Sequence, residues 1–202
     1  MNQTNLIRIA GTADALAIAE IYAPYVRETS GNFETEAPGP MEMAHRIGLI
    51  LQTHPWLVCE VNGVVAGYAY ASAHRAREAY RWSAECSVYL SPAFHGKKIG
   101  SALYQALFGI LRYQGFRNVY AGIGLPNEGS VSFHRSSGFG PVGIYHKIGY
   151  KHGAWRDVQW WEFRLSGDEE PPETVTKFSE IIDNQYVKEI LFSASHSFTV
   201  SG

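Results

Sequence analysis

Cysteine, long apolar runs and an excess of charge of either sign are all scarce in this chain of 202 residues. Its two cysteines, Cys59 and Cys86, lie in strand-like runs without the spacing of a zinc site or a disulfide framework. We therefore expect two buried thiols and no metal. No apolar run approaches the roughly 18 residues that a membrane-spanning helix needs, and Met1 to Ile9 lacks the apolar core of a signal peptide. These absences predict a cytoplasmic protein without a membrane partner.

The chain is close to electrical neutrality, with 17 Lys and Arg residues against 19 Asp and Glu residues. A net charge of -2 provides no basic surface for sequence-independent binding of nucleic acid, so we expect no nucleic-acid partner. Hydrophobic residues make up 46% of the chain and aromatic residues 13%, which is enough to fill the core of one ordinary domain.

Acidic residues are concentrated at the C-terminal end. Residues 1–165 hold 15 basic and 12 acidic side chains, whereas residues 166–202 hold 2 and 7. The run from Ser166 to Pro172 has the composition of a linker, and the residues after it lack the spacing of a long amphipathic helix. We expect one domain over residues 1–165, followed by an acidic linker and an accessory tail over residues 166–202.

Hydrophobic periodicity predicts a chain of mixed strands and helices. Asn62-Gly63, between two β-rich runs, is the strongest hairpin signal in the sequence. Strands are expected at 7–9, 57–61, 64–70, 84–90, 118–123, 142–145 and 156–165, and helices after residue 14 and at 41–51, 100–113 and 127–137. This order, with a hairpin in the middle and strand-helix units after it, predicts an α+β fold with a mixed sheet.

The stretch from Val88 to Leu103 is the most informative for function, because a strand runs into a Gly- and Lys-bearing turn that opens a helix. Small residues at Gly96, Gly100 and Ser101 let backbone N–H groups approach an anion at the positive end of the helix dipole. A diphosphate fits such a site, although the spacings typical of ATP and dinucleotide loops are absent. The alternative is a glycine-punctuated turn that merely begins a helix.

Two motifs resemble those of the GNAT acyltransferases. Val88-Tyr89-Leu90 followed by His95 to Leu103 is similar to motif A, Gln/Arg-x-x-Gly-x-Gly/Ala, with His95 and Lys98 departing from two of its three defining positions. Gly124 to Phe139 resembles the second cofactor motif of that family. Stretches at 21–22, 29–34, 79–85 and 149–157 narrow the resemblance to the phosphinothricin and methionine sulfoximine N-acetyltransferases, over about residues 6 to 165.

The resemblance implies the GNAT fold, a mixed twisted sheet with splayed central strands flanked by helices. It also implies acetyl-CoA as co-substrate between strands 84–90 and 118–123, and a homodimer. The positions that match cofactor binding are Val88, Tyr89, Leu90, His95, Gly96, Lys97, Lys98, Ile99, Gly100, Ser101, Asn127 and Ser136.

Four of these cofactor positions carry a further expectation. Lys98 in place of glycine restricts the turn, and its positive charge offsets part of that loss. Asn127 both binds cofactor and caps the helix that follows, or it only caps the helix. A backbone N–H group of Tyr89 or Leu90 is expected to polarise the acetyl carbonyl.

Acetyl transfer to an amine needs a neutral nitrogen and a proton for the departing thiolate. Glu85 matches the family's proposed base, and His134 occupies the position of a general acid. Because a carboxylate is a weaker base than an amine, we expect Glu85 to need burial or a bridging water. The alternatives are a structural salt bridge from Glu85 to Arg81 or Arg77, and a packed histidine at 134.

An amino-acid acceptor carries a carboxylate, which cations grip. The acceptor pocket is expected to contain Phe33, Arg75, Arg77, Glu85, Ser87 and Lys151. Solvated charge on a surface loop is the alternative for the two arginines.

The resemblance therefore implies an acetyl-CoA-dependent N-acetyltransferase. Its acceptor would be the α-amino group of small amino-acid analogues such as phosphinothricin, methionine sulfoximine or methionine sulfone. Two other functions stay open from the sequence, a protein or peptide N-terminal acetyltransferase and a non-catalytic module that binds acyl-CoA.

Overall fold

The computed structural model describes residues 4–167 and 173–200, and within them a single sheet has seven strands in the order β1-β2-β3-β4-β5-β7-β6. The strands are β1 (Asn5–Ile9), β2 (Trp56–Val61), β3 (Val64–Ala73), β4 (Ser83–Leu90), β5 (Asn118–Gly124), β6 (Gly140–Lys151) and β7 (Ala154–Arg164). The β4–β5 pair is parallel and the other pairs are antiparallel, which confirms the expected mixed sheet.

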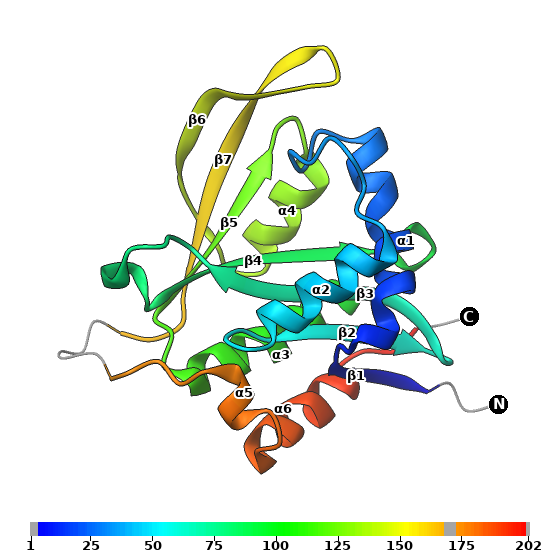
Figure 1. Cartoon of the computed structure of the whole chain (residues 1–202), viewed down its shortest axis with the longest axis vertical. Helices are drawn as coiled ribbons and strands as arrows, with labels where there is room; N and C mark the ends of the chain where they lie inside the picture. The colour runs from blue at the N-terminus through cyan, green and yellow to red at the C-terminus, as the bar shows by residue number, and fades with distance from the viewer. Residues whose placement is uncertain (1–3, 168–172, 201–202) are drawn as a thin grey trace.

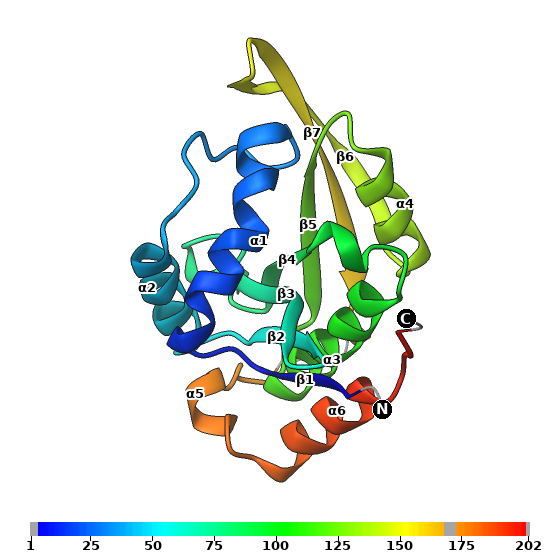
Figure 2. The ribbon, with the colours of Figure 1, turned by 90° about the vertical axis from the view of Figure 1, so that its right-hand side faces the viewer.

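Helices cover both faces of this sheet (Figures 1 and 2). They are α1 (Ala15–Glu28), α2 (Pro40–Ile50), α3 (Ile99–Gln114), α4 (Glu128–Ser136), α5 (Phe178–Ile181) and α6 (Gln185–Ser195). The predicted apolar face of α3 is buried, and the helix ends at Gly115, whose positive φ of 96° is typical of a helix C-terminus.

Two hydrophobic clusters lie on opposite faces of the sheet, and successive side chains of β2 contribute to them alternately. Leu57 and Cys59 belong to the cluster beneath α3, whereas Trp56 and Val58 belong to the cluster beneath α1 and α2. Successive side chains of a strand point to opposite faces, so a strand that is covered on both sides is apolar at nearly every position.

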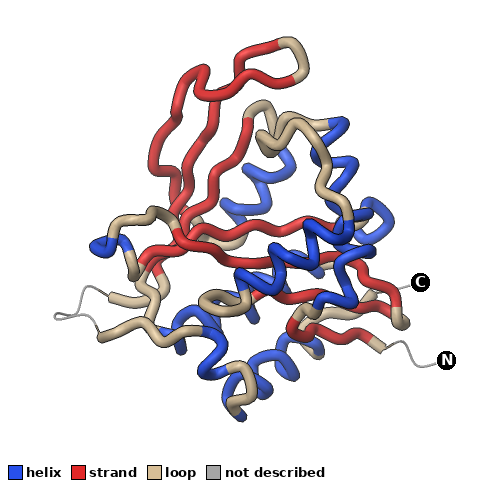
Figure 3. Tube along the Cα trace, viewed as in Figure 1, coloured by secondary structure: helices blue, strands red, loops and turns tan. Residues whose placement is uncertain are grey.

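The central strands β4 and β5 separate after a short paired region. They pair only from Ser83 to Glu85 and from Asn118 to Tyr120. Beyond that point β4 stays with β3 as far as Leu90, while β5 follows β7, and the two diverge visibly (Figures 1 and 3). The splayed pair that the resemblance implied is therefore present, and its opening faces the N-terminal end of α3.

The C-terminal tail packs on the same core as the rest of the chain. Phe178, Val187, Phe198 and Val200 are buried in the cluster beneath α3, and α6 packs against α3 and β1. The sequence left the position of the tail open and predicted no long amphipathic helix, but α6 extends over 11 residues. The part of the expected linker from Asp168 to Pro172 lies outside the described residues.

A buried histidine makes the stability of this fold depend on pH. His54 is 8% exposed, its Nδ1 lies 2.8 Å from the Thr53 hydroxyl oxygen, and its ring packs against Phe116. Burial lowers the pKa of His54 to about 4, whereas an unfolded chain binds this proton near pH 6.5. Stability is therefore lost as pH falls below about 6.5, because the unfolded state then takes up a proton that the folded state does not.

We expect wild type to lose about 2 kcal/mol more unfolding free energy than His54→Gln between pH 7 and pH 4.5. Urea unfolding of both proteins at the two pH values measures this difference. Equal losses in the two proteins would show that His54 does not carry this pH dependence.

Candidate active site

A cavity of about 480 Å³ fills the opening between β4 and β5. It brings together nine of the residues expected from the sequence, namely Ser87, Val88, Tyr89, Leu90, His95, Gly96, Gly100, Asn127 and His134. Asn32 and Phe133, from stretches that carry the resemblance, also line it, as do Tyr25, Cys86 and Tyr104, which no motif marked.

The backbone of β4 offers hydrogen-bonding groups to this cavity at alternate residues. The Ser91 N–H donates to the Ala66 carbonyl across the β3–β4 register. Because such pairs alternate in an antiparallel ladder, the Tyr89 backbone also faces β3, and the Val88 and Leu90 backbones face the opening. Of the two N–H groups expected to polarise the acetyl carbonyl, only the Leu90 N–H is therefore turned toward the cavity. Tyr89 lines the cavity, but its N–H faces β3.

The turn before α3 adopts the left-handed conformation at two positions. Gly96 has a φ of 73° and Lys98, at the N-cap of α3, a φ of 60°. Lys98 therefore takes a conformation that favours glycine, at the position where the motif has glycine. The first N–H groups of a helix have no partner within it, so those of Ile99, Gly100 and Ser101 are available to an anion, while the Ile99 side chain is buried in the core.

His95 and Tyr25 fix the end of β4 to α1. The Tyr25 hydroxyl donates to the Leu90 carbonyl at 2.6 Å, and His95 Nε2 lies 3.1 Å from the same hydroxyl oxygen. Burial raises the pKa of Tyr25, so the phenol keeps the hydrogen that it donates. His95, at the Gln/Arg position of the motif, is thereby held at the mouth of the cavity.

The two cofactor positions on the second motif differ in their placement. Asn127 lines the cavity, and its Oδ1 accepts from the Ser130 N–H at 3.1 Å, so it also caps α4. Ser136 does not line the cavity. Its hydroxyl donates to the Phe133 carbonyl at 2.9 Å, within its own helix.

A chain of hydrogen bonds runs along the wall of the cavity through His134. His134 Nδ1 lies 2.8 Å from the Ser130 carbonyl oxygen, which can only accept, so Nδ1 carries a hydrogen. Burial lowers the pKa of His134, partly offset by this bond, and the ring is neutral at pH 7. Its Nε2 then accepts from the Tyr104 hydroxyl at 2.9 Å, which in turn accepts from the Cys86 thiol at 3.4 Å.

Glu85 stands at the point where β4 and β5 part, opposite Tyr120 in the last paired position. Its Oε1 lies 2.9 Å from His74 Nδ1. The expected alternative of an arginine partner is not what the structure shows, since Arg81 pairs with Glu78 instead. The Glu85 side chain is 32% exposed, so water reaches it, and of the two expected aids the structure favours a bridging water over full burial.

The loop at residues 29–33 borders one side of the cavity through Gly31 and Asn32, and the β6–β7 hairpin holds this loop in place. Lys151 Nζ donates to the Asn32 carbonyl at 2.9 Å, and His152 Nε2 lies 3.1 Å from the Thr29 carbonyl oxygen. The Phe33 ring packs where Gly149 has no side chain. Neither Lys151 nor Phe33 lines the cavity; both position the loop that does. Burial lowers the pKa of Lys151, although Glu34 partly offsets this effect.

The expected acceptor arginines lie elsewhere. Arg75 and Arg77 line a separate cavity of about 330 Å³, which the tail segment at 174–177 also borders. The Arg75 guanidinium lies 5.9 Å from the centre of the Trp160 ring. Within the described residues, therefore, these two side chains are not brought to the opening between β4 and β5.

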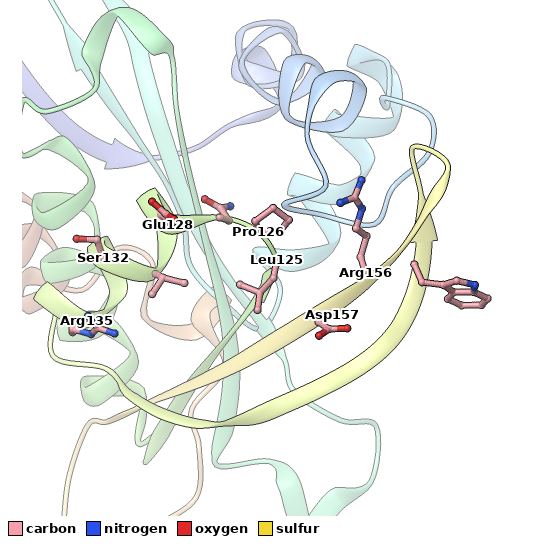
Figure 4. Close-up of a pocket in the computed structure, with 10 residues that line it drawn as sticks. Leu125, Pro126, Glu128, Ser132, Arg135, Arg156 and Asp157 are labelled. Atoms are coloured by element: carbon pink, nitrogen blue, oxygen red, sulfur yellow. The ribbon is translucent and has the colours of Figure 1, made fainter.

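A larger cavity of about 730 Å³ lies between α4 and β7. Figure 4 shows Arg135 and Ser132 on the α4 side and Arg156 and Asp157 on β7. The Asp157 carboxylate is already engaged by the Lys147 N–H and by His146, and β4 contributes nothing to this cavity. The cavity between β4 and β5 is therefore the better candidate despite its smaller volume.

The residues that the structure describes lack two further features. No group of three or more His, Cys, Asp and Glu side chains is placed to hold a metal ion there. In the same part of the chain, no helix combines the length and the apolar character needed to cross a bilayer.

Comparison with known proteins gives a consistent result. Residues 7–160 match the family described as an acetyltransferase (GNAT) domain. A phosphinothricin N-acetyltransferase of Streptomyces viridochromogenes is 41% identical over 173 residues, which are 85% of this chain and 94% of that protein. An L-methionine sulfoximine/L-methionine sulfone acetyltransferase of Salmonella typhimurium is 34% identical and covers 79% of this chain and 94% of its own length.

A solved structure also has this fold. The GNAT superfamily phosphinothricin acetyltransferase of Sinorhizobium meliloti, crystallised with acetyl-CoA, superposes with a TM-score of 0.78. It is 37% identical, and the match covers 87% of this chain and 98% of that chain.

Proposed function

The chain belongs to the GNAT acetyltransferases, and from this premise we propose that it acetylates the α-amino group of small amino-acid analogues such as phosphinothricin, methionine sulfoximine and methionine sulfone. The observation that carries the proposal is the cavity between β4 and β5, with Glu85 at the position where the two strands part and the α3 turn at the mouth of the cavity. The similarity to relatives with these substrates supports the choice of acceptor.

The shape and chemistry of the cavity suit acetyl-CoA, which when bound supplies the acetyl group as a thioester. The backbone of Val88, turned toward the opening, offers pairing groups to an amide of its pantetheine arm as an added strand would. The N–H groups at the start of α3, with the helix dipole behind them, hold its diphosphate. The Leu90 N–H is the donor in place to polarise the acetyl carbonyl.

On the acceptor side, Glu85 takes up the proton that the substrate amine must lose, and it does so through water. Ser87, two residues further along the strand, points to the same face of the sheet and lines the cavity. His74 holds the Glu85 carboxylate by its Nδ1, so it acts as a positioning residue for the base.

On the thiolate side, Tyr104 is better placed than His134 to meet the departing sulfur. A neutral His134 that already donates from Nδ1 has no hydrogen on Nε2 to give. Burial raises the pKa of Tyr104 well above its usual value, so its hydroxyl keeps a hydrogen. By turning that hydrogen from His134 toward the cavity, Tyr104 stabilises the negative charge that develops on sulfur, while His134 positions it.

This assignment predicts that the two residues act as one unit. Tyr104→Phe and His134→Gln are each expected to lower kcat about tenfold, because the first removes the hydrogen bond to developing charge and the second removes the ring that positions its donor. The double variant should be no slower than the worse single variant. Steady-state rates and KM for acetyl-CoA measure this. Losses that multiply in the double variant would instead indicate two independent roles.

The proposed function is tested by release of CoA thiol during incubation with acetyl-CoA and a panel of acceptors. The panel contains phosphinothricin, methionine sulfoximine, methionine sulfone, the common free amino acids and a short peptide with a free N-terminus. We expect turnover with one or more of the three analogues and little with the peptide. Turnover with the peptide alone would indicate an N-terminal acetyltransferase, and CoA binding without turnover on any amine would indicate a binding module.

The proposal extends to a cytoplasmic homodimer. Val142, Ile144, Ile148 and Trp155 on the β6–β7 hairpin are each more than two-fifths exposed, an apolar surface that a second copy of the chain would cover. The two free cysteines are buried and suit a reducing compartment. Light scattering should give about twice the mass of one chain, and a monomer at micromolar concentration would contradict this part of the proposal.

A further inference from the structure

The end of the tail lies beside the turn that opens α3. A cavity of about 350 Å³ is lined by Gly96, Lys97 and Lys98 on one side and by His196, Ser197, Phe198 and Thr199 on the other. Gly96 also lines the cavity between β4 and β5, so both cavities border the turn proposed to hold the diphosphate. The tail lies beyond the residues that match the family.

From this juxtaposition we infer that the tail completes the acetyl-CoA site, with Lys98, His196 and Thr199 binding the 3′-phosphorylated ribose of the nucleotide end. The inference rests on the proposed use of acetyl-CoA. In CoA the diphosphate joins the pantetheine arm to the 3′-phosphoadenosine. A ligand whose arm fills the first cavity and whose diphosphate lies at the turn therefore has its second anion near the second cavity.

The tail is anchored so that its polar side chains face this cavity. Phe198 and Val200 are buried while Ser197 and Thr199 are exposed, the alternation of an extended segment with one face on the core. The Ser195 hydroxyl accepts from the Ile7 N–H at 2.8 Å, and the Asn5 side chain donates to the Phe198 carbonyl at 3.2 Å. These contacts with β1 hold the segment in place before any ligand binds, which limits the ordering cost.

The hydrogen-bonding partners of these groups decide which of them can bind an anion. His196 Nδ1 donates to the Phe192 carbonyl oxygen at 2.7 Å, so its Nε2 donates to a phosphate only when the ring carries a second proton. The Ser197 hydroxyl donates to the Ala194 carbonyl. Lys97 lies with its Nζ 5.4 Å from the centre of the Phe94 ring, which leaves Lys98 as the more exposed cation of the turn.

The distribution of acidic residues along the tail also suits an anion at this cavity. All seven acidic residues of the segment 166–202 precede Ile190, and none occurs from Ile190 to the end of the chain. The acidic part of the tail is thus separate from the part that borders the cavity. A phosphate there meets the Lys97 and Lys98 ammonium groups without a carboxylate among the lining residues.

The experiment compares CoA with dephospho-CoA, which lacks only the 3′-phosphate, by isothermal titration at one fixed salt concentration. The proteins are full-length wild type, His196→Ala, Thr199→Val and the corresponding double variant. Lys188→Ala serves as control, because it removes an exposed cation from α6 outside the cavity. The thermal midpoint of each protein checks its folding, and the anchors Phe198 and Val200 are untouched in all of them.

We expect wild type and Lys188→Ala to bind CoA about tenfold more tightly than dephospho-CoA. In the double variant this ratio should fall to about two, with the affinity for dephospho-CoA changed less than twofold, and the single variants should lie between. A wild-type ratio near one, or a double variant that keeps the wild-type ratio, overturns the inference while leaving the proposed function intact. Failure of folded wild type to bind either ligand overturns both.

Discussion

Glu85→Gln is expected to lower kcat by roughly 10²–10⁴-fold, the range typical of a positioned general base. The substitution keeps the size of the side chain and its place on β4 but removes the negative charge that, in the proposed mechanism, takes up the proton of the substrate amine. The affinity for CoA should change less than about twofold, because Glu85 does not line the cavity between β4 and β5. Thiol release and CoA titration on the same protein separate the two effects.

Glu42→Gln is the matched control for this prediction. Glu42 is an exposed carboxylate on α2 that pairs with Arg46, and such a surface pair, screened by solvent, adds little to stability. Its turnover should equal that of wild type. An unchanged rate in Glu85→Gln would remove Glu85 from the mechanism, and an equal fall in CoA affinity and rate would make it a residue of cofactor binding.

Local sequence signals predicted most elements of the central sheet. Asn62 and Gly63 both have positive φ, 52° and 79°, the conformation that a two-residue hairpin turn requires. The helix at 99–114 followed from its apolar spacing, and Gly138, with a φ of 91°, lies two residues beyond the end of α4 at Ser136. Each of these signals is carried by residues close in sequence, so each could be found without the fold.

Features that depend on distant contacts were harder to predict. The sequence indicated a strand only at 142–145, yet β6 extends from Gly140 to Lys151. Most of its side chains are exposed, so it lacks the apolar alternation that marks a half-buried strand. The tail helix α6 was missed for a related reason, since its short apolar stripe gains meaning only from α3 and β1, against which it packs.

The residues of the candidate site also differ in whether local sequence or distant contacts define them. The β4 strand and the turn before α3 form one continuous motif, and the structure brings most of that motif to the cavity. Tyr104 was missed because it lies among the apolar residues of α3 and resembles one more core position until Cys86 and His134 are seen beside it. The side of the cavity at residues 29–33 depends on pairs such as Lys151 and Asn32, which lie 119 residues apart, and no local pattern marks such a pair.

Gly124→Ala is expected to lower kcat/KM for the amino-acid acceptor by about 10²-fold. A Cβ on Gly124 would overlap the Ser30 carbonyl oxygen, and backbone cannot yield as a flexible side chain does. The loop at 29–33, whose Gly31 and Asn32 line the cavity, must then move by about 1 Å, a displacement that can cost about 10²-fold in rate. The contacts of Lys151 and His152 with this loop would be strained as well.

Gly124→Ala should lower kcat/KM for the acceptor and change the affinity for CoA much less, because the displaced loop does not border the turn before α3. Gly48→Ala is the control: nothing lies within 4 Å of a Cβ at this position on α2, and alanine favours a helix over glycine by about 1 kcal/mol. That variant should be at least as stable as wild type and equally active. If Gly124→Ala kept the acceptor KM and kcat of wild type, the loop at 29–33 would not form the acceptor side, and the amine would have to enter the opening between β4 and β5 from another direction.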